Sequence, residues 1–174
     1  TTPFDPAWVL RWDRFDPASE GTREVLCTLA NGYWGTRGAV PGTRISSVHY
    51  PGTYMAGVFN RLTSMVQGRV VETEHMVNIQ DWTPLVVTPR HGRPLLPGEE
   101  NLVEYGQEMD LRRGVLSRTM TFEDEQGRRT TVHTRQFTSL ANRHLAAIEL
   151  TVVAENWSGD LTVRSKIEGR VANL

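Results

Sequence analysis

The sequence predicts an all-β protein, an antiparallel β-sandwich. Apolar residues recur with a period of two in several segments, and clusters of turn-forming residues separate those segments. No window sustains an amphipathic helical face with a cap at both ends. We therefore expect about seven short strands with polar turns between them, and no helices of the kind that support a parallel α/β sheet.

The C-terminal third shows the alternation most clearly. One apolar face in residues 145–152 is made by alternating side chains: Ala146, Ile148, Leu150 and Val152. Residues 161–167 alternate in the same way. Both segments are predicted to be half-buried antiparallel strands, joined as a hairpin by the turn-forming residues 155–160.

Further strands are predicted upstream. Residues 115–123 carry Leu116, Met120 and Phe122 on one face, and the turn 124–127 leads into a return strand at 128–137. Three more segments have strand character: 54–59, 70–79 and 85–88. Residues 88–101 contain three prolines and two glycines and predict a surface loop.

Composition excludes several classes of protein. The 174 residues carry a net charge of −1, which gives no electrostatic footprint for nucleic acid or an anionic membrane. No apolar run approaches the roughly 20 residues of a membrane helix. Cys27 is the only cysteine, so an intrachain disulfide and a cysteine-built zinc site are excluded. A reducing, cytoplasmic location is expected.

Residues 31–38 read Asn-Gly-Tyr-Trp-Gly-Thr-Arg-Gly and form the most unusual segment. The glycine spacing fits neither a dinucleotide fingerprint nor a phosphate loop, so a nucleotide site is not expected. Two interpretations stay open. The glycines serve a tight turn, or the loop faces a sugar, with Trp34 stacked on a pyranose ring and Arg37 donating hydrogen bonds.

A second segment, residues 50–61, begins with a Pro-Gly turn and continues as an aromatic strand at 54–59 that Gly57 interrupts. Tyr54 and Asn60 are its candidate sugar contacts, although aromatic residues in such a strand also pack in cores. If Arg37 binds sugar, Arg37→Ala in the full-length protein raises KM for the sugar more than it lowers the melting temperature. The reverse pattern identifies Arg37 as scaffold.

No catalytic or metal-binding constellation is evident from the residues. Glu72 and Glu74 share one strand face but have no reason to be buried, as general acid–base pairs require. His75 points to the opposite face from Glu74, which argues against a shared metal ion. We therefore expect no catalytic residue and no metal site in this chain.

Seven short motifs in order resemble the N-terminal domain of glycoside hydrolase family 65, which contains phosphorylases of maltose, trehalose and kojibiose. The resemblance covers nearly the whole chain from about Thr22. Its motifs are residues 31–38, 51–60, 111–116, 127–128, 135–139, 156–159 and 167–171.

The resemblance implies a β-super-sandwich, similar to galactose mutarotase, that precedes an (α/α)6 barrel. Residues 1–21 are then a lead-in segment and residues 22–174 the β-sandwich domain, shorter than the usual sandwich of the family. The catalytic barrel is absent from this chain, so this chain alone is not expected to be an enzyme, whereas its parent protein is.

The implied parent enzyme cleaves an α-linked glucose disaccharide with inversion, by phosphorolysis or hydrolysis. Inorganic phosphate is then a co-substrate, and no cofactor is implied. The resemblance assigns this domain structural and oligomer-forming work, with Trp34, Arg37, Tyr54 and Asn60 as substrate-binding candidates. The partners are the sugar, the chain's own barrel and further copies of the protein, with no nucleic acid and no membrane.

Two alternatives stay open. A free-standing carbohydrate-binding module would need an exposed aromatic platform, for which Trp34, Trp82 and Trp157 are candidates. Titration with maltose, trehalose and kojibiose distinguishes this module from a scaffold. A mutarotase-like enzyme would need His and Glu converging in one cleft, and the spacings give no support for it.

Overall fold

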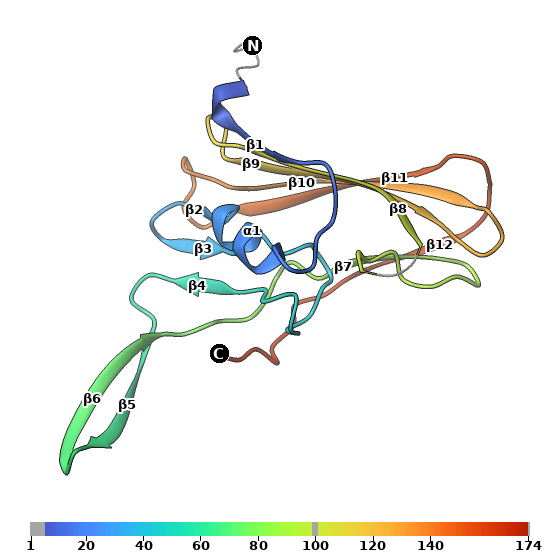
Figure 1. Cartoon of the computed structure of the whole chain (residues 1–174). Coiled ribbons are helices and arrows are strands. Elements are labelled where there is room, and N and C mark those ends of the chain that lie inside the picture. Colours follow the sequence, from blue (N-terminus) through green and yellow to red (C-terminus); the bar gives the residue numbers. More distant parts are fainter. Residues whose placement is uncertain (1–5, 99–100, 174) are drawn as a thin grey trace.

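A computed structural model describes residues 6–98 and 101–173, and in this part of the chain the predicted β-sandwich is confirmed (Figure 1). After a 3₁₀ turn at Pro6–Trp8, the larger layer is a five-stranded antiparallel sheet with the order β1-β8-β9-β10-β11. Its strands are β1 (Val9–Trp12), β8 (Leu102–Asp110), β9 (Val115–Glu123), β10 (Arg129–Thr138) and β11 (Ala146–Ala154).

The inner face of this sheet carries two apolar clusters, and Leu116 belongs to the one that also contains Cys27, Leu29 and Met109. The predicted face of β9 is confirmed, because Leu116, Met120 and Phe122 are all buried. The cluster around Met120 and Phe122 also contains Val40, Val87, Leu95, Tyr105 and Val132. Leu150 and Val152 of β11 pack against it, as their alternation predicts.

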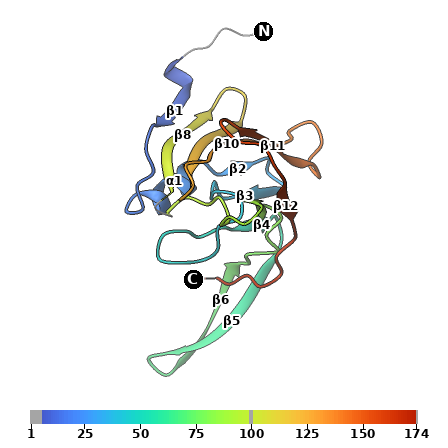
Figure 2. The ribbon, with the colours of Figure 1, turned by 90° about the vertical axis from the view of Figure 1, so that its right-hand side faces the viewer.

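The second layer consists of two small sheets. One contains β2 (Leu29–Ala30), β3 (Trp34–Thr36) and β4 (Thr53–Met55). The other pairs β7 (Leu85–Pro89) with β12 (Leu161–Ser165). Figure 2 shows both small sheets on the same side of the large sheet, which is the two-layer arrangement of a sandwich.

The predicted hairpin between the last two strands is wrong. β11 pairs with β10 in the large sheet, whereas β12 pairs with β7 in the opposite layer. Residues 155–160 therefore carry the chain from one layer to the other. Trp157 fixes this crossing, because its indole N–H donates to the Arg129 carbonyl at 3.1 Å and to Thr130 Oγ1 at 3.0 Å. β12 is exposed along its whole length rather than half-buried.

Two features near the N-terminus differ from expectation. The segment expected as a lead-in contains β1, which pairs with residues 107–110 of β8. A seven-residue helix α1 (Glu20–Leu26) follows, although no helix was predicted. Its buried residues are Glu20, Arg23 and Glu24, so a search for an apolar stripe does not find it.

The strand expected at 54–59 with an interruption at Gly57 divides there into two strands. Gly57 adopts a φ of +81°, which ends β4 and turns the chain into β5 (Phe59–Val66). β5 pairs with β6 (Arg69–Met76) to form a long hairpin that projects from the domain (Figures 1 and 2). The expected loop at 88–101 has no strand beyond Pro89 in its described part, and residues 99–100 lie outside the described residues.

Gly38 provides a test of the packing between α1 and β3. A Cβ atom at this position would lie 2.5 Å from Cys27 Cβ and 2.7 Å from the Cys27 carbonyl oxygen. We expect Gly38→Ala to destabilise the domain by about 2 kcal/mol, because the backbone must shift to accept it. Because a domain of this size loses about 2–4 °C of melting temperature per kcal/mol, the melting temperature should fall by roughly 4–8 °C.

The matched control is Gly106→Ala in β8, where a Cβ would meet nothing within 4 Å. This variant should melt within about 1 °C of the wild type. Equal melting of the two variants would show that helix α1 and residue 38 are not packed as described.

Candidate functional site

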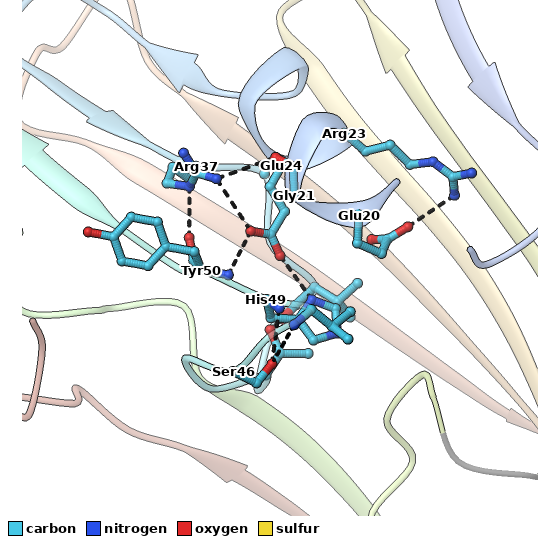
Figure 3. A network of polar contacts seen from close by, with 12 residues as sticks. Glu20, Gly21, Arg23, Glu24, Arg37, Ser46, His49 and Tyr50 are labelled. Atoms are coloured by element: carbon cyan, nitrogen blue, oxygen red, sulfur yellow. Dashed lines mark hydrogen bonds and ion pairs between the residues drawn. The ribbon is translucent and has the colours of Figure 1, made fainter. Parts of the chain in front are cut away.

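Glu24 is the centre of a buried polar network that joins three segments of the chain (Figure 3). Its side chain is fully buried on α1, with Oε1 2.9 Å from His49 Nδ1. Its Oε2 accepts the Tyr50 backbone N–H at 2.8 Å and lies 3.6 Å from the Arg37 guanidinium. Because a buried carboxylate is costly without partners, these contacts hold the three segments together.

Arg37 uses its remaining donors inside the domain. Its Nε donates to the Tyr50 carbonyl at 2.7 Å, and the guanidinium lies 5.0 Å from the centre of the Tyr50 ring. Its backbone N–H donates to the Gly52 carbonyl at 2.8 Å. The side chain therefore clamps the end of β3 to residues 50–52, and its contacts are those of a scaffold.

Glu20 and Arg23 form a second buried pair on α1, visible beside the Glu24 network in Figure 3. Arg23 donates to Glu20 Oε1 at 3.0 Å and to the Arg14 carbonyl at 2.8 Å, and it lies over the ring of Trp12. Burial raises the pKa of Glu20, and the positive charge of Arg23 opposes that shift without cancelling it.

A third polar group connects the large sheet to the loop after β3. Arg118 is 2% exposed, donates to the Gly38 carbonyl, and donates through Nε to Gln107 Oε1 at 3.0 Å. The Tyr105 hydroxyl donates to the same oxygen at 2.7 Å, and Gln107 Nε2 lies 3.2 Å from Cys27 Sγ. Burial raises the pKa of Tyr105 to about 12, so its hydroxyl stays protonated.

The four candidate sugar-binding residues do not come together in one place. Trp34 pairs with Met55 across β3 and β4, and Gly35 pairs with Tyr54, so Trp34 and Tyr54 lie on opposite faces of this sheet. Tyr54 shares its face with Arg37, near Tyr50. Burial, reinforced by a hydrogen bond with Tyr50, raises the pKa of Tyr54 to about 12.

Trp34 and Asn60 occupy different surroundings. Trp34 stacks on Trp82 with ring centres 5.9 Å apart, and Trp82 Nε1 donates to Thr36 Oγ1 at 3.0 Å. Asn60 is exposed at the root of the β5–β6 hairpin, opposite His75. Trp157 lies at the start of β10, away from this stack, so the three tryptophans do not form a single platform.

Two cavities of similar size open on the described surface beside a smaller one of about 370 Å³ at β1, β8 and β9. One, of about 750 Å³, has a mixed apolar and charged lining that includes Arg44, Asp81, Arg164, Lys166 and Glu168. The other, of about 780 Å³, lies beside the turn between β9 and β10. Both are wide enough for a small polar ligand, in the usual range for such sites.

The carboxyl groups of the first cavity are not arranged as a proton donor. Arg170 Nε lies 3.0 Å from Glu168 Oε1, and Lys166 Nζ lies 2.6 Å from Glu168 Oε2. These two cations hold the Glu168 carboxyl as an ion and keep its pKa far below the ordinary value. The Asp81 carboxylate accepts the N–H and hydroxyl of Thr83. A general acid for glycosidic cleavage needs a raised pKa. Among the described carboxyl groups, that of Glu20 has a raised pKa, and Glu20 lines neither cavity.

The network around Glu24 was not predicted, because its members are far apart in the sequence. Glu24 and His49 are 25 positions apart, and neither belongs to a local motif. The described residues hold no group of three His, Cys, Asp or Glu side chains placed to bind a metal ion. A search of the same residues found no helix with the length and apolar character that crossing a membrane requires.

Arg37→Ala tests whether this residue is scaffold. Loss of the guanidinium removes one partner of a fully buried carboxylate, and we expect a cost of about 2 kcal/mol. Thermal melting should therefore fall by roughly 4–8 °C. Arg164→Ala, which removes an exposed arginine of the cavity, is the control and should shift melting by about 1 °C or less. An unchanged melting temperature with weakened sugar binding would favour the sugar-facing interpretation.

Glu20→Gln tests the raised pKa. A carboxyl whose pKa is higher in the folded than in the unfolded state costs stability as the pH rises above its ordinary value of 4.5. The glutamine variant lacks this cost. The melting temperature of the variant minus that of the wild type should therefore become more positive from pH 4.5 to 7.5. A difference that becomes more negative would show that the Arg23 pair outweighs the burial.

Comparison with known proteins identifies relatives over nearly the whole chain. An uncharacterized glycosyl hydrolase of Mycobacterium tuberculosis is 40% identical over 169 residues, which cover 97% of this chain and 13% of that protein. A kojibiose phosphorylase of Caldanaerobacter subterraneus is 32% identical over 97% of this chain and 21% of its own length. An alpha,alpha-trehalose phosphorylase of Thermoanaerobacter brockii is 28% identical over 99% of this chain and 23% of its own length.

A solved structure supports the fold. This protein from the human microbiome, assigned as a kojibiose phosphorylase, superposes with a TM-score of 0.75 and 19% identity over 83% of this chain and 19% of its own. The chain thus spans between 13% and 23% of the length of these four proteins. Residues 10–174 match the family described as glycosyl hydrolase family 65, N-terminal domain. The chain therefore belongs to glycosyl hydrolase family 65 and is an N-terminal domain of that family.

Proposed function

We propose that this domain is the non-catalytic β-domain of an enzyme that cleaves an α-glucosidic disaccharide by inverting phosphorolysis. The observation that carries the proposal is the family match over residues 10–174, together with relatives named as kojibiose, trehalose and maltose phosphorylases. Phosphate then attacks the anomeric carbon, the glycosidic bond breaks, and β-glucose 1-phosphate and glucose leave. Phosphate is the co-substrate, and the location is cytoplasmic.

The geometry favours a scaffold role for the described residues. The buried carboxylates of α1 are engaged with Arg23, Arg37 and His49, and the ionised Glu168 is engaged with two cations. Inverting cleavage needs an acid with a raised pKa facing the substrate. We therefore assign the catalytic acid and the phosphate-binding groups to the region that follows this domain. Self-association of the whole protein stays a prediction.

The test is an assay of the polypeptide that the complete reading frame encodes. We expect release of glucose 1-phosphate from kojibiose, trehalose or maltose only when inorganic phosphate is present. Nuclear magnetic resonance of the product should show the β-anomer, because the reaction inverts. The 174-residue chain alone is the control and should release none.

Two results would contradict the proposal. Sugar cleavage at the same rate without phosphate would identify a hydrolase, in which water takes the place of phosphate. A reading frame that ends at residue 174 would leave no catalytic region. In that case, binding of kojibiose, trehalose or maltose by the chain itself, measured by calorimetry, would favour a binding module.

A further inference from the structure

The β5–β6 hairpin, residues 59–76, is an arm that stands away from the rest of the domain. Every residue of both strands is exposed, and Figures 1 and 2 show the hairpin projecting beyond both layers of the sandwich. An isolated two-stranded hairpin is marginally stable in water. An arm of this length is therefore expected to rest against another surface.

Seven of the exposed side chains of the arm are large and apolar. Met65 and Val70 face each other across its outer end, with exposed fractions of 67% and 69%. Five more large apolar residues of the arm are exposed: Phe59, Leu62, Val66, Val71 and Met76. Such a concentration marks an interaction surface rather than a solvated one.

The charges of the arm indicate what kind of surface it contacts. Two arginines and two glutamates give the arm no formal net charge, and Arg61 pairs with Glu74 across the strands at 2.9 Å. A neutral arm gives no attraction for nucleic acid or an anionic membrane. The complementary surface is an apolar protein surface.

The arm is already folded for contact. Gln67 and Gly68 both adopt positive φ, 50° and 76°, as the tight turn of a regular hairpin requires. Eight cross-strand pairs follow without a bulge. Little conformational entropy is therefore lost on docking, which favours affinity.

The last described residues of the chain are fastened to the root of the arm. Asn173 Oδ1 accepts the Asn78 N–H at 2.7 Å, and Asn173 Nδ2 donates to the Met76 carbonyl at 3.0 Å. The Ala172 carbonyl accepts from Asn78 Nδ2 at 3.2 Å and from the Tyr50 hydroxyl at 3.3 Å. A polypeptide that continues past residue 174 therefore leaves the domain beside the arm (Figure 1).

We propose that the arm docks on an apolar surface of the catalytic region that follows residue 174, and so fixes the β-domain to it. The inference rests on the proposed function, which places that region after this domain. Because the connection starts at the root of the arm, the contact is intramolecular and has a high effective concentration. A second copy of the chain has no such advantage at low protein concentration.

The first experiment measures how accessible residue 65 is to a maleimide reagent. Cys27 is fully buried, so Met65→Cys introduces a thiol that is exposed in the 174-residue chain. In the complete polypeptide we expect labelling at residue 65, located by peptide mass mapping, to be at least tenfold slower. The control is Glu125→Cys in the β9–β10 turn, whose side chain is 87% exposed and should label equally fast in both proteins.

A second variant tests the apolar contact itself. Met65→Glu should change hydrogen exchange of residues 59–66 by no more than about twofold in the 174-residue chain, because Met65 is exposed there and a single cross-strand pair, with Val70, is altered. In the complete polypeptide the same substitution should accelerate their exchange about tenfold. Identical exchange in the two forms of the complete polypeptide would overturn the proposal.

Two further outcomes would overturn it. Equal labelling rates at residue 65 in the short and complete proteins would show that the arm is free. Protection that appears in the 174-residue chain and rises with its concentration, together with a doubled mass in light scattering, would assign the arm to a second copy. Protection of the arm in a protein that lacks phosphorolysis would refute the proposed function and leave the docking intact.

Discussion

The buried carboxylate of Glu24 is the constraint on which the arrangement of the second layer depends. A charge without access to water must be satisfied by its neighbours, and here a histidine, a backbone amide and a guanidinium surround it. These partners belong to residues 37–50, so the helix, β3 and the segment before β4 have to meet. Once Arg37 is clamped at residues 50–52, the register of β3 against β4 is determined, and alternation then turns Trp34 to the opposite face.

The same principle joins the two layers. Arg118 lies on the inner face of β9 between apolar neighbours, and its donors reach Gln107 on β8 and the Gly38 carbonyl after β3. The interior therefore has two apolar clusters, one around Phe122 and one around Leu116, and Arg118 stands between the residues that β9 contributes to them. Because hydrogen bonds depend on direction more strongly than apolar contacts do, the polar contacts of Arg118 set the position of one layer over the other. The close approach of Gly38 to Cys27 belongs to the same junction.

Three strands of the large sheet, β9, β10 and β11, could be predicted from the sequence, because they follow the period-two rule and the turn between β9 and β10 contains the expected residues. β1 and β8 were not predicted. The inner face of β9 is the clearest example, although Arg118 also occupies it and hydropathy alone would place a charge outside. Helix α1 could not be predicted, since its buried face consists of charged residues whose partners are remote in the sequence. The crossing of residues 155–160 between layers was missed for a related reason. Turn composition shows where a strand ends but not which strand the chain joins next.

The interior of this domain differs from its contact surfaces in which side chains have partners within the domain. The buried charges at Glu20, Glu24 and Arg118 are each held by internal partners, while Arg118 Nη1 lacks a partner among the described residues. The opposite holds for β5, β6 and β12, whose apolar side chains are exposed. An interior held by directional contacts keeps the root of the arm in place through Asn78, which bonds to the Thr53 N–H in the second layer and to the C-terminal segment. A rigid root lets a small hairpin transmit the position of the whole domain to the surface it contacts, so the arm needs no net charge to be specific.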